Sequence, residues 1–240
     1  TFPLPRAQRC FVAAYGDLPS AWELCRRIAQ SPLKPALVEV LDPDAGRIVA
    51  DEKLPAGQWC VIAAAIGHQP VVERHARDLA QLAQQTGAVH FAALEDGDKQ
   101  RLLGRVREFL RIVSEQHPGA AVLRAAVLPA TAVGTCERIA AIARESGLPC
   151  ARLLRAGNTT FAVLHSTGAE GNAALLAALW SLLRAGSGVE RMTIEHLPTE
   201  LKSQIQVWGA TREDFALMKR VKQVFDPHGI LSPGRFVGGL

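Results

Sequence analysis

Residues 121–165 read AVLRAAVLPATAVGTCERIAAIARESGLPCARLLRAGNTTFAVLH, and this stretch decides the fold. Short apolar runs alternate in it with a segment of helical periodicity that Gly147 and Pro149 bring to an end. The region downstream continues the alternation with a further helix and strand. The expected elements are strands at 121–128, 150–155, 161–165 and 189–196 and helices at 131–146 and 170–185. The predicted order is therefore βαββαβ.

The same order is predicted for the first part of the chain. The expected elements there are strands at 10–15, 36–41, 59–66 and 88–94, helices at 21–29 and 71–85, and a polar loop at 42–58. A single helix at 96–113, with one apolar stripe, links the two parts. Each βαββαβ set is typical of a ferredoxin-like unit. We therefore expect an α+β fold in which two ferredoxin-like units form one antiparallel sheet covered by helices, followed by a C-terminal helix and an extended tail.

This organisation predicts four segments. The first ferredoxin-like half spans 1–95, the linking helix 96–118, the second half 119–200, and the C-terminal helix and tail 201–240. Several strands, such as 61–66, are apolar on both faces, which is unusual for an antiparallel sheet with one solvated side. We therefore expect the second face to be covered as well, by the other half or by an absent domain.

Composition excludes several classes of protein. With 48% hydrophobic and 21% charged residues in 240, the chain is globular and not disordered. The net charge of +4 is spread along the chain and aromatic residues make up only 5%, so we expect no nucleic acid partner. The longest apolar run, 173–183, is too short to span a membrane. The five cysteines form no C-x-x-C pair and are interpreted as buried thiols of a reducing, cytoplasmic compartment.

Several catalytic motifs are absent from the sequence. It contains no dinucleotide-binding glycine motif opening a helix after a strand, no phosphate-binding loop and no hydrolase nucleophile elbow. The seven histidines never occur as H-x-H or H-E-x-x-H, the spacings that let two imidazoles of one element reach a metal. We therefore predict no metal site, and the residues alone assign no catalytic group.

The C-terminal segment carries the most specific signal. Thr211 followed by a carboxylate at Asp214 predicts a capped helix start, and the helix is expected to run to about Val224. Pro227 and Gly229 then end it with a turn. The expected buried side of this helix consists of Phe215, Met218, Val221 and Val224 or Phe225.

The segment 218–235, MKRVKQVFDPHGILSPGR, closely resembles the C-terminus of FAD-linked oxidases of the vanillyl-alcohol oxidase and D-lactate dehydrogenase type. With Val207-Trp208-Gly209 and the final residues 235–240, the ending is most similar to the FAD-binding subunits of bacterial glycolate oxidases. The resemblance implies that the chain is a C-terminal cap that roofs the flavin ring. It also implies an N-terminal flavin-binding domain that is missing here, as the non-Met start leads us to expect, and a tail that returns to that domain.

The resemblance further implies FAD as the cofactor of the whole protein, although not of this chain alone. The implied partners are sister flavin and iron–sulfur subunits, which would hold the protein at the periphery of a membrane, and a small 2-hydroxy acid as substrate. We expect glycolate to be oxidised to glyoxylate in the intact complex and the isolated chain to be inactive. The alternative is a non-catalytic assembly module of a multisubunit flavin oxidase.

Catalytic relatives carry a His-x-x-Gly-Asp-Gly-Asn-x-His stretch, to which residues 153–161 correspond here. Only Gly157 and Asn158 match, and both histidines are lost, so metal-assisted chemistry is not implied. Arg155 is the candidate carboxylate-binding residue, because its planar fork matches a carboxylate, and Asn158 is a candidate flavin contact. The same residues also fit a plain hairpin turn.

The tail supplies the remaining candidate cofactor residues, Ser232, Pro233, Gly234 and Arg235. Ser232 departs from the family, which usually has Asn at this position, although a serine hydroxyl still donates one hydrogen bond. Arg235 is expected to contact the flavin phosphates or the flavin domain. Its alternative is a solvated charge of the tail.

Overall fold

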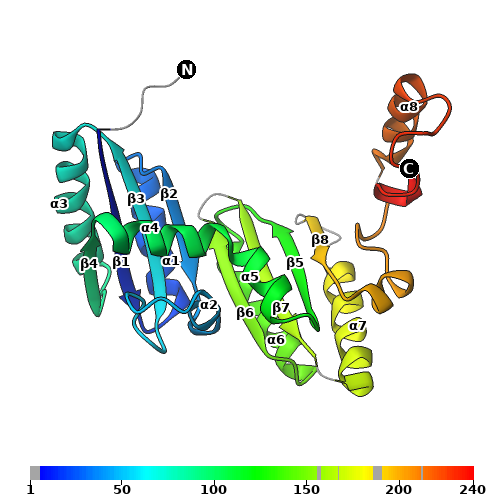
Figure 1. Cartoon of the computed structure of the whole chain (residues 1–240), viewed down its shortest axis with the longest axis horizontal. Coiled ribbons are helices and arrows are strands. Elements are labelled where there is room, and N and C mark those ends of the chain that lie inside the picture. Colours follow the sequence, from blue (N-terminus) through cyan, green and yellow to red (C-terminus); the bar gives the residue numbers. More distant parts are fainter. Residues whose placement is uncertain (1–5, 156–157, 167, 186–190, 212) are drawn as a thin grey trace.

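The computed structural model describes residues 6–155, 158–166, 168–185, 191–211 and 213–240. Its strands are β1 (Ala7–Tyr15), β2 (Leu37–Leu41), β3 (Trp59–Gly67), β4 (His90–Leu94), β5 (Ala120–Ala126), β6 (Cys150–Arg155), β7 (Thr159–His165) and β8 (Arg191–His196). They form one eight-stranded sheet in the order β4-β1-β3-β2-β6-β7-β5-β8 (Figure 1). Every neighbouring pair is antiparallel, so the predicted antiparallel sheet with helices is confirmed.

Helices lie on both faces of this sheet. They are α1 (Leu18–Gln30), α2 (Pro43–Val49), α3 (Gln69–Gln85), α4 (Asp96–Arg107), α5 (Phe109–Gln116), α6 (Ala132–Glu145), α7 (Gly168–Ala185) and α8 (Phe215–Phe225), with 3₁₀ turns η1 (Thr199–Gln204) and η2 (Val237–Gly239). The apolar sides of α1, α3, α6 and α7 pack on one face. Helices α2, α4 and α5 pack on the other.

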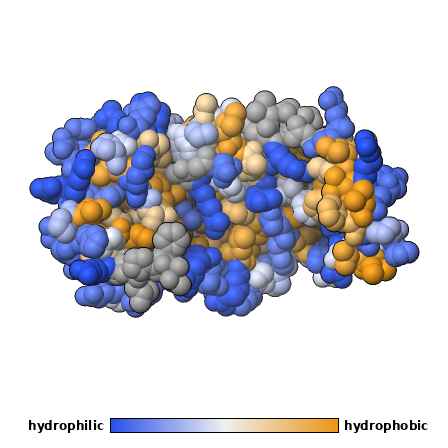
Figure 2. All heavy atoms as spheres, turned by 90° about the horizontal axis from the view of Figure 1, so that it is seen from above, coloured by the Kyte–Doolittle hydropathy of each residue, from blue (hydrophilic) through white to orange (hydrophobic). Residues whose placement is uncertain are grey.

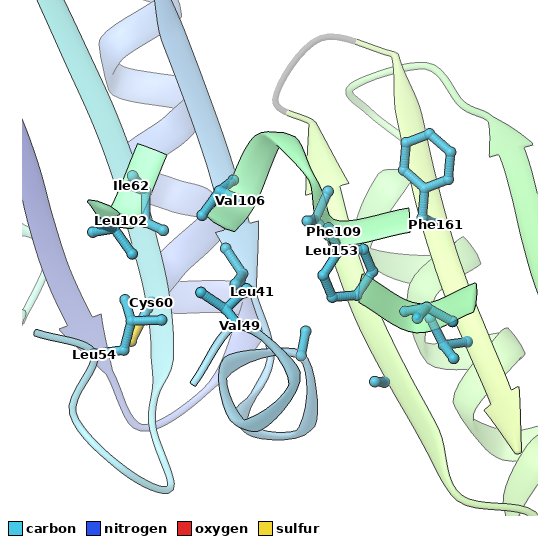
Figure 3. Packing of buried hydrophobic residues seen from close by; sticks show 14 of the residues in the cluster. Leu41, Val49, Leu54, Cys60, Ile62, Leu102, Val106, Phe109, Leu153 and Phe161 are labelled. Carbon is cyan, nitrogen blue, oxygen red and sulfur yellow. The ribbon is translucent and has the colours of Figure 1, made fainter. Parts of the chain in front are cut away.

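The second face is therefore covered, but by α2 and the linking helices α4 and α5 of the chain itself. Figure 3 shows Val106 of α4 and Phe109 of α5 directed at the sheet, with Phe109 beside Leu153 of β6. Val106 is fully buried and Phe109 is 2% exposed. Each such side chain contributes about 1.5–3 kcal/mol by leaving water. The expectation that the other half or an absent domain covers this part of the face was wrong, because α2, α4 and α5 already do so.

Two local predictions were also wrong. Within the expected polar loop at 42–58, residues 43–49 form helix α2, whose start Asp42 caps by accepting a hydrogen bond from the Ala45 amide (2.7 Å). Pro43 occupies the first helical position, where a missing N–H costs nothing. The expected helix at 96–113 consists of two helices, α4 and α5, which meet at Glu108. The break lets one helix pack on each part of the sheet.

The two four-stranded parts of the sheet meet at the β2–β6 pair. This pairing is short: Glu39 lies opposite Arg155, Val40 opposite Leu154, and Leu41 opposite Leu153.

Just beyond the paired residues, Asp42 and Arg152 form an ion pair (Oδ2–Nε 2.7 Å) with side chains 1% and 16% exposed. The guanidinium of Arg152 also lies over the ring of Trp59, 4.8 Å from its centroid. A buried ion pair therefore reinforces the shortest pairing in the sheet.

The C-terminal region extends past the β8 edge of the sheet (Figure 1). Helix α8 begins at Phe215, with no side-chain cap, so the predicted capped start at Thr211 was wrong. None of its residues is buried, and Val221, Val224 and Phe225 are 47–80% exposed, so its expected buried side does not exist within the described residues. Figure 2 shows hydrophobic side chains gathered at this end of the molecule. No helix in the described ranges is long and apolar enough to cross a membrane.

Candidate functional site

Arg155, the predicted substrate residue, ends β6 on the same side of the sheet as α4 and α5. Its guanidinium lies 5.1 Å from the ring centroid of Phe161 and its Nε 3.3 Å from Oε1 of Glu39. The Arg155 side chain is 49% exposed. In the part of the chain that the structure describes, no hydrogen bond from the Arg155 guanidinium is found, and half of the side chain is open to solvent. The guanidinium can therefore reach a carboxylate.

Arg155 lines a cleft of about 610 Å³ between the sheet and α4. Its floor comes from β1, β2 and β3, with Glu39 and the apolar Leu37 and Ala64 among the lining residues. Lys99 and Arg107 line it from α4. The cleft thus combines a partly apolar floor with three cationic side chains, an arrangement that suits a small organic anion.

Glu39 is the acidic group of this cleft. The residue is only 5% exposed, and its Oε2 atom is buried without a hydrogen-bond partner. Burial raises the pKa of Glu39 to about 7, and the positive charge of Arg155 offsets only part of that rise. Near neutral pH the carboxyl therefore exists in both protonation states. It can donate or accept a hydrogen bond.

A second polar group lies further along the same face. Arg124 of β5 lies opposite Phe161 in the register, and its Nε contacts Glu195 (2.7 Å) and Thr193 (3.5 Å) of β8. The Arg124 side chain is 43% exposed. With Arg155, it places a second half-exposed guanidinium on this side of the sheet.

Asn158, the other candidate from the hairpin, is exposed. Its side-chain Oδ1 accepts a hydrogen bond from the hydroxyl of Thr159 (2.9 Å), and its carbonyl oxygen accepts one from the Val127 amide (2.8 Å). These bonds shape the chain at the β6–β7 connection. Gly157, which matches the family stretch, lies outside the described residues.

The tail candidates form a separate turn. Ser232 has φ 47° and Gly234 φ 73°, both in the left-handed region, and the Arg235 amide closes the turn on the Ser232 carbonyl (3.2 Å). Trp208 Nε1 donates to the Arg235 carbonyl (3.2 Å), and its ring meets Phe236 edge-on. All four candidates, residues 232–235, are exposed. They lie at the end of α8, beyond β8.

The candidate residues therefore fall into two groups. Arg155 and Asn158 lie at the β6–β7 connection, while strands β7, β5 and β8 separate them from the tail turn at 232–235 (Figure 1).

Sequence reasoning missed Glu39, although a signal was present. A single carboxylate in the otherwise apolar stretch LVEVL predicts either a face that is not fully covered or a functional charge. Arg124 gave a similar signal within AAVLRAA. Its partner Glu195 could not be foreseen, because strand pairing brings them together.

The cysteines add no reactive group to this site. All five cysteines are free, and burial raises the pKa of Cys10, Cys25, Cys60 and Cys150 to about 12 and that of Cys136 to about 11. A thiol with such a pKa is a poor nucleophile at neutral pH. Within the described ranges, no group of three or more His, Cys, Asp or Glu side chains is placed to hold a metal ion.

Comparison with known families gives one match that spans almost the whole chain. Residues 4–236 match the family described as "FAD linked oxidases, C-terminal domain". Comparison with the curated proteins gives no match.

Solved structures share the fold at low sequence identity. The 4-ethylphenol oxidase from Gulosibacter chungangensis, in its isoeugenol complex, has 18% identity and a TM-score of 0.69, over 98% of this chain and 54% of that one. p-Cresol methylhydroxylase with substrate bound has 15% identity and a TM-score of 0.72, over 96% and 53%. An alkyldihydroxyacetonephosphate synthase has 14% identity and a TM-score of 0.54, over 94% and 44%. The chain thus spans about half the length of these proteins.

Proposed function

The chain belongs to the FAD-linked oxidases as their C-terminal domain, and from this premise we propose that it is the cap of an FAD-dependent oxidoreductase acting on small 2-hydroxy acids. The specific proposal is the FAD-binding subunit of a glycolate oxidase, which converts glycolate to glyoxylate. When bound, FAD would accept a hydride equivalent from the α-carbon of the substrate. The cap would bind the carboxylate and exclude water.

One observation carries the choice of substrate class: the half-exposed guanidinium of Arg155 at the mouth of a cleft that Lys99 and Arg107 also line. A guanidinium binds a carboxylate through two parallel hydrogen bonds. The phenols named for two structural neighbours, 4-ethylphenol and p-cresol, carry no carboxylate. Three cations around one cleft therefore favour an anionic substrate for this chain.

The half-exposed polar residues on the sheet face that carries Arg155 also fit a flavin ring near them. Arg155 and Arg124 are half-exposed cations on that face, and a cation near the ring stabilises the negative charge of a reduced flavin. Asn158 remains a candidate contact of the ring. Ser232, Pro233, Gly234 and Arg235 are proposed to approach the flavin domain or its phosphates, because the exposed apolar side of α8 beside them suits a domain interface.

The finer architecture is part of the same proposal. The strand orders β4-β1-β3-β2 and β6-β7-β5-β8 fit two ferredoxin-like units, with halves at 1–95 and 119–200, a linker at 96–118 and a terminal segment at 201–240. A flavin-binding domain preceding this chain, sister flavin and iron–sulfur subunits, and a cytoplasmic location at the membrane periphery complete it.

The test is anaerobic reduction of the intact protein that contains this cap. We expect a yellow protein whose flavin absorbance bleaches with glycolate and not with 4-ethylphenol. Replacing Arg155 by Met should weaken the response to glycolate at least tenfold, because one charge-assisted bidentate contact is worth about 1.5–3 kcal/mol. Arg74→Met, which replaces an exposed arginine of α3 that does not line this cleft, serves as the matched control. Bleaching by 4-ethylphenol alone would reject the substrate class.

A second function is favoured by the exposed apolar side of α8, which suits a subunit interface as well as a domain interface. In this alternative the cap is a non-catalytic assembly module of a multisubunit oxidase. A bound flavin that glycolate fails to bleach, in a protein that still assembles with its sister subunits, would support it. Loss of assembly on replacing Val224 and Phe225 by Ser would agree with that outcome.

A further inference from the structure

Glu39 lies in the middle of β2, where burial makes its charge costly. It is 5% exposed, its Oε2 atom has no hydrogen-bond partner, and Oε1 has one cationic neighbour, Arg155 Nε at 3.3 Å. A buried carboxylate that lacks full pairing is unstable as an ion. The Glu39 charge therefore depends on Arg155.

The elements packed around Glu39 supply the other groups that act on it. On its own strand the same-face neighbours are Leu37 and Leu41, and on β3 the opposite residue is Ile62, all apolar. The cleft is completed by Gln8 of β1 and by Lys99 and Arg107 of α4. These two cations have partners elsewhere, since Lys99 donates to the Gln8 carbonyl (3.0 Å) and Arg107 contacts Glu108 (3.4 Å). Arg155 is thus the main ionic partner of Glu39.

An incoming carboxylate competes with Glu39 for this arginine. The Arg155 side chain is half-exposed, so a ligand can reach its guanidinium from solvent. Once the guanidinium binds a ligand carboxylate, its positive charge stabilises the Glu39 anion less, and the ligand brings a second negative charge near it. Both effects favour protonation of Glu39.

We propose that Glu39 and Arg155 form a proton-coupled binding site for small 2-hydroxy carboxylates, in which Arg155 takes the ligand carboxylate while Glu39 takes up one proton from solvent. The neutral carboxyl of Glu39 then donates a hydrogen bond to the ligand. This inference rests on the proposed function and adds to it the group that detects the ligand charge. Glu39 thus contacts the ligand through this hydrogen bond and senses the ligand charge through Arg155.

The raised pKa of Glu39, about 7, places the effect in the physiological range. With a pKa of about 7, part of the Glu39 carboxyl population is ionised at neutral pH, so binding there takes up a fraction of one proton per site. Uptake should fall toward zero near pH 5.5, where the carboxyl is already protonated before glycolate binds.

The test is isothermal calorimetry of the whole 240-residue chain, and of the intact protein, with glycolate as the probe. Titrations at pH 7 in two cationic buffers of different ionisation enthalpy give the number of protons taken up. We expect about 0.3–0.5 proton per bound glycolate for the wild type and none for Glu39→Gln, which should still bind. Arg155→Met should reduce the affinity at least tenfold. Glu195→Gln, which removes the acid of the comparable Arg124 pair on this face (2.7 Å), should leave uptake unchanged.

Proton uptake that persists in Glu39→Gln would overturn the inference, and so would glycolate binding without uptake or an absence of glycolate binding to the intact protein. Circular dichroism of each variant shows that the fold is retained. Failure of the proposed function is a separate result. If glycolate bleaches the flavin without proton uptake, the inference alone is wrong. If uptake occurs but glycolate never reduces the flavin, the site stands and the oxidase assignment fails.

Discussion

Removing the charge of Asp42 should weaken the junction between the two parts of the sheet. Asp42 follows β2 and pairs with Arg152 of β6 (2.7 Å), and its other oxygen caps α2 through the Ala45 amide. Burial raises the pKa of Asp42, and the hydrogen bond from Ala45 and the charge of Arg152 offset part of that rise. The ion pair is therefore costly to bury, but breaking it leaves a buried cation without its partner.

The expected loss follows from these contacts. Asp42→Asn keeps the cap but leaves Arg152, 16% exposed, without an anion. Such a change lowers the free energy of unfolding by about 3–5 kcal/mol. We expect a loss of about 3 kcal/mol, because the Arg152 guanidinium keeps its cation–π contact with the Trp59 ring. Asp42→Ala also removes the cap, which adds about 1 kcal/mol. With an m-value of about 3 kcal/mol/M in urea, the midpoints should fall by about 1 M and 1.3 M.

The assay is equilibrium unfolding in urea, followed by tryptophan fluorescence and far-UV circular dichroism. Asp44→Asn is the matched control, because Asp44 lies in the same helical turn but pairs with Arg47 at the surface, where ion pairs contribute about 0–1 kcal/mol. Adding Arg152→Met to Asp42→Asn should recover most of the loss, since no unpaired charge remains. A loss for Asp42→Asn no larger than that of Asp44→Asn would refute the reasoning.

Four further outcomes test other parts of the structure. Burial raises the pKa of Glu39 from its usual value of 4.5 to about 7, so ionisation of this carboxyl opposes folding. Its contribution to the free energy of unfolding is therefore complete below pH 4.5 and is lost as pH rises through 7. Glu39→Gln should remove on the order of 2–3 kcal/mol of the difference between urea titrations at pH 5 and pH 8. Ser232→Asn should stabilise the tail turn by about 0.5 kcal/mol, because asparagine adopts φ 47° more readily than serine. The Arg235 amide should then be better protected from hydrogen exchange. The hydrogen bond from Lys222 lowers the pKa of Asp226, and the Leu231 and Ile230 amides lower it further. Asp226 therefore stabilises the tail above pH 3.8, and this stabilisation is lost on further acidification. Limited proteolysis of the tail should speed up at acid pH in the wild type, and Asp226→Asn should abolish that change. Gly238→Ala should displace the tail from Phe215, because the ring atoms of Phe215 lie 2.5 Å from the position of the added Cβ. The fluorescence emission of Trp208 should shift as a result. Gly239→Ala is the control: its Cβ meets nothing within 4 Å, so it tests the cost of a positive φ alone.

Local patterns allowed most elements to be predicted. Apolar alternation and helical periodicity depend on neighbouring residues, so the eight strands and the helices α1, α3, α6 and α7 were expected close to their observed bounds. Helix α2 was missed because it is short and depends on the Asp42 cap. The break at Glu108 was missed because α4 and α5 keep one continuous apolar stripe across it, and only their packing on different parts of the sheet separates them.

The candidate site divides in the same way. Arg155 was selected as a candidate from the resemblance of its stretch to the family, and the tail candidates from their own motif, since both signals lie in contiguous residues. Glu39 was missed because it becomes a candidate only through its pairing with a strand more than a hundred residues away. The prediction of a buried side for α8 was also wrong. An apolar stripe favours packing of a helix against some surface, but it does not say whether this chain supplies that surface.

The amino-acid sequence by itself determined the order of strands and helices and the family to which the C-terminal motif belongs, because both depend on short-range spacing. Only the tertiary structure decided that a buried carboxyl on β2 faces a half-exposed guanidinium on β6, under two cations of α4. That meeting results from the register of a three-residue strand pairing and from the helices packed over the sheet. Shifting this pairing by one residue would turn one of the two side chains to the opposite face of the sheet.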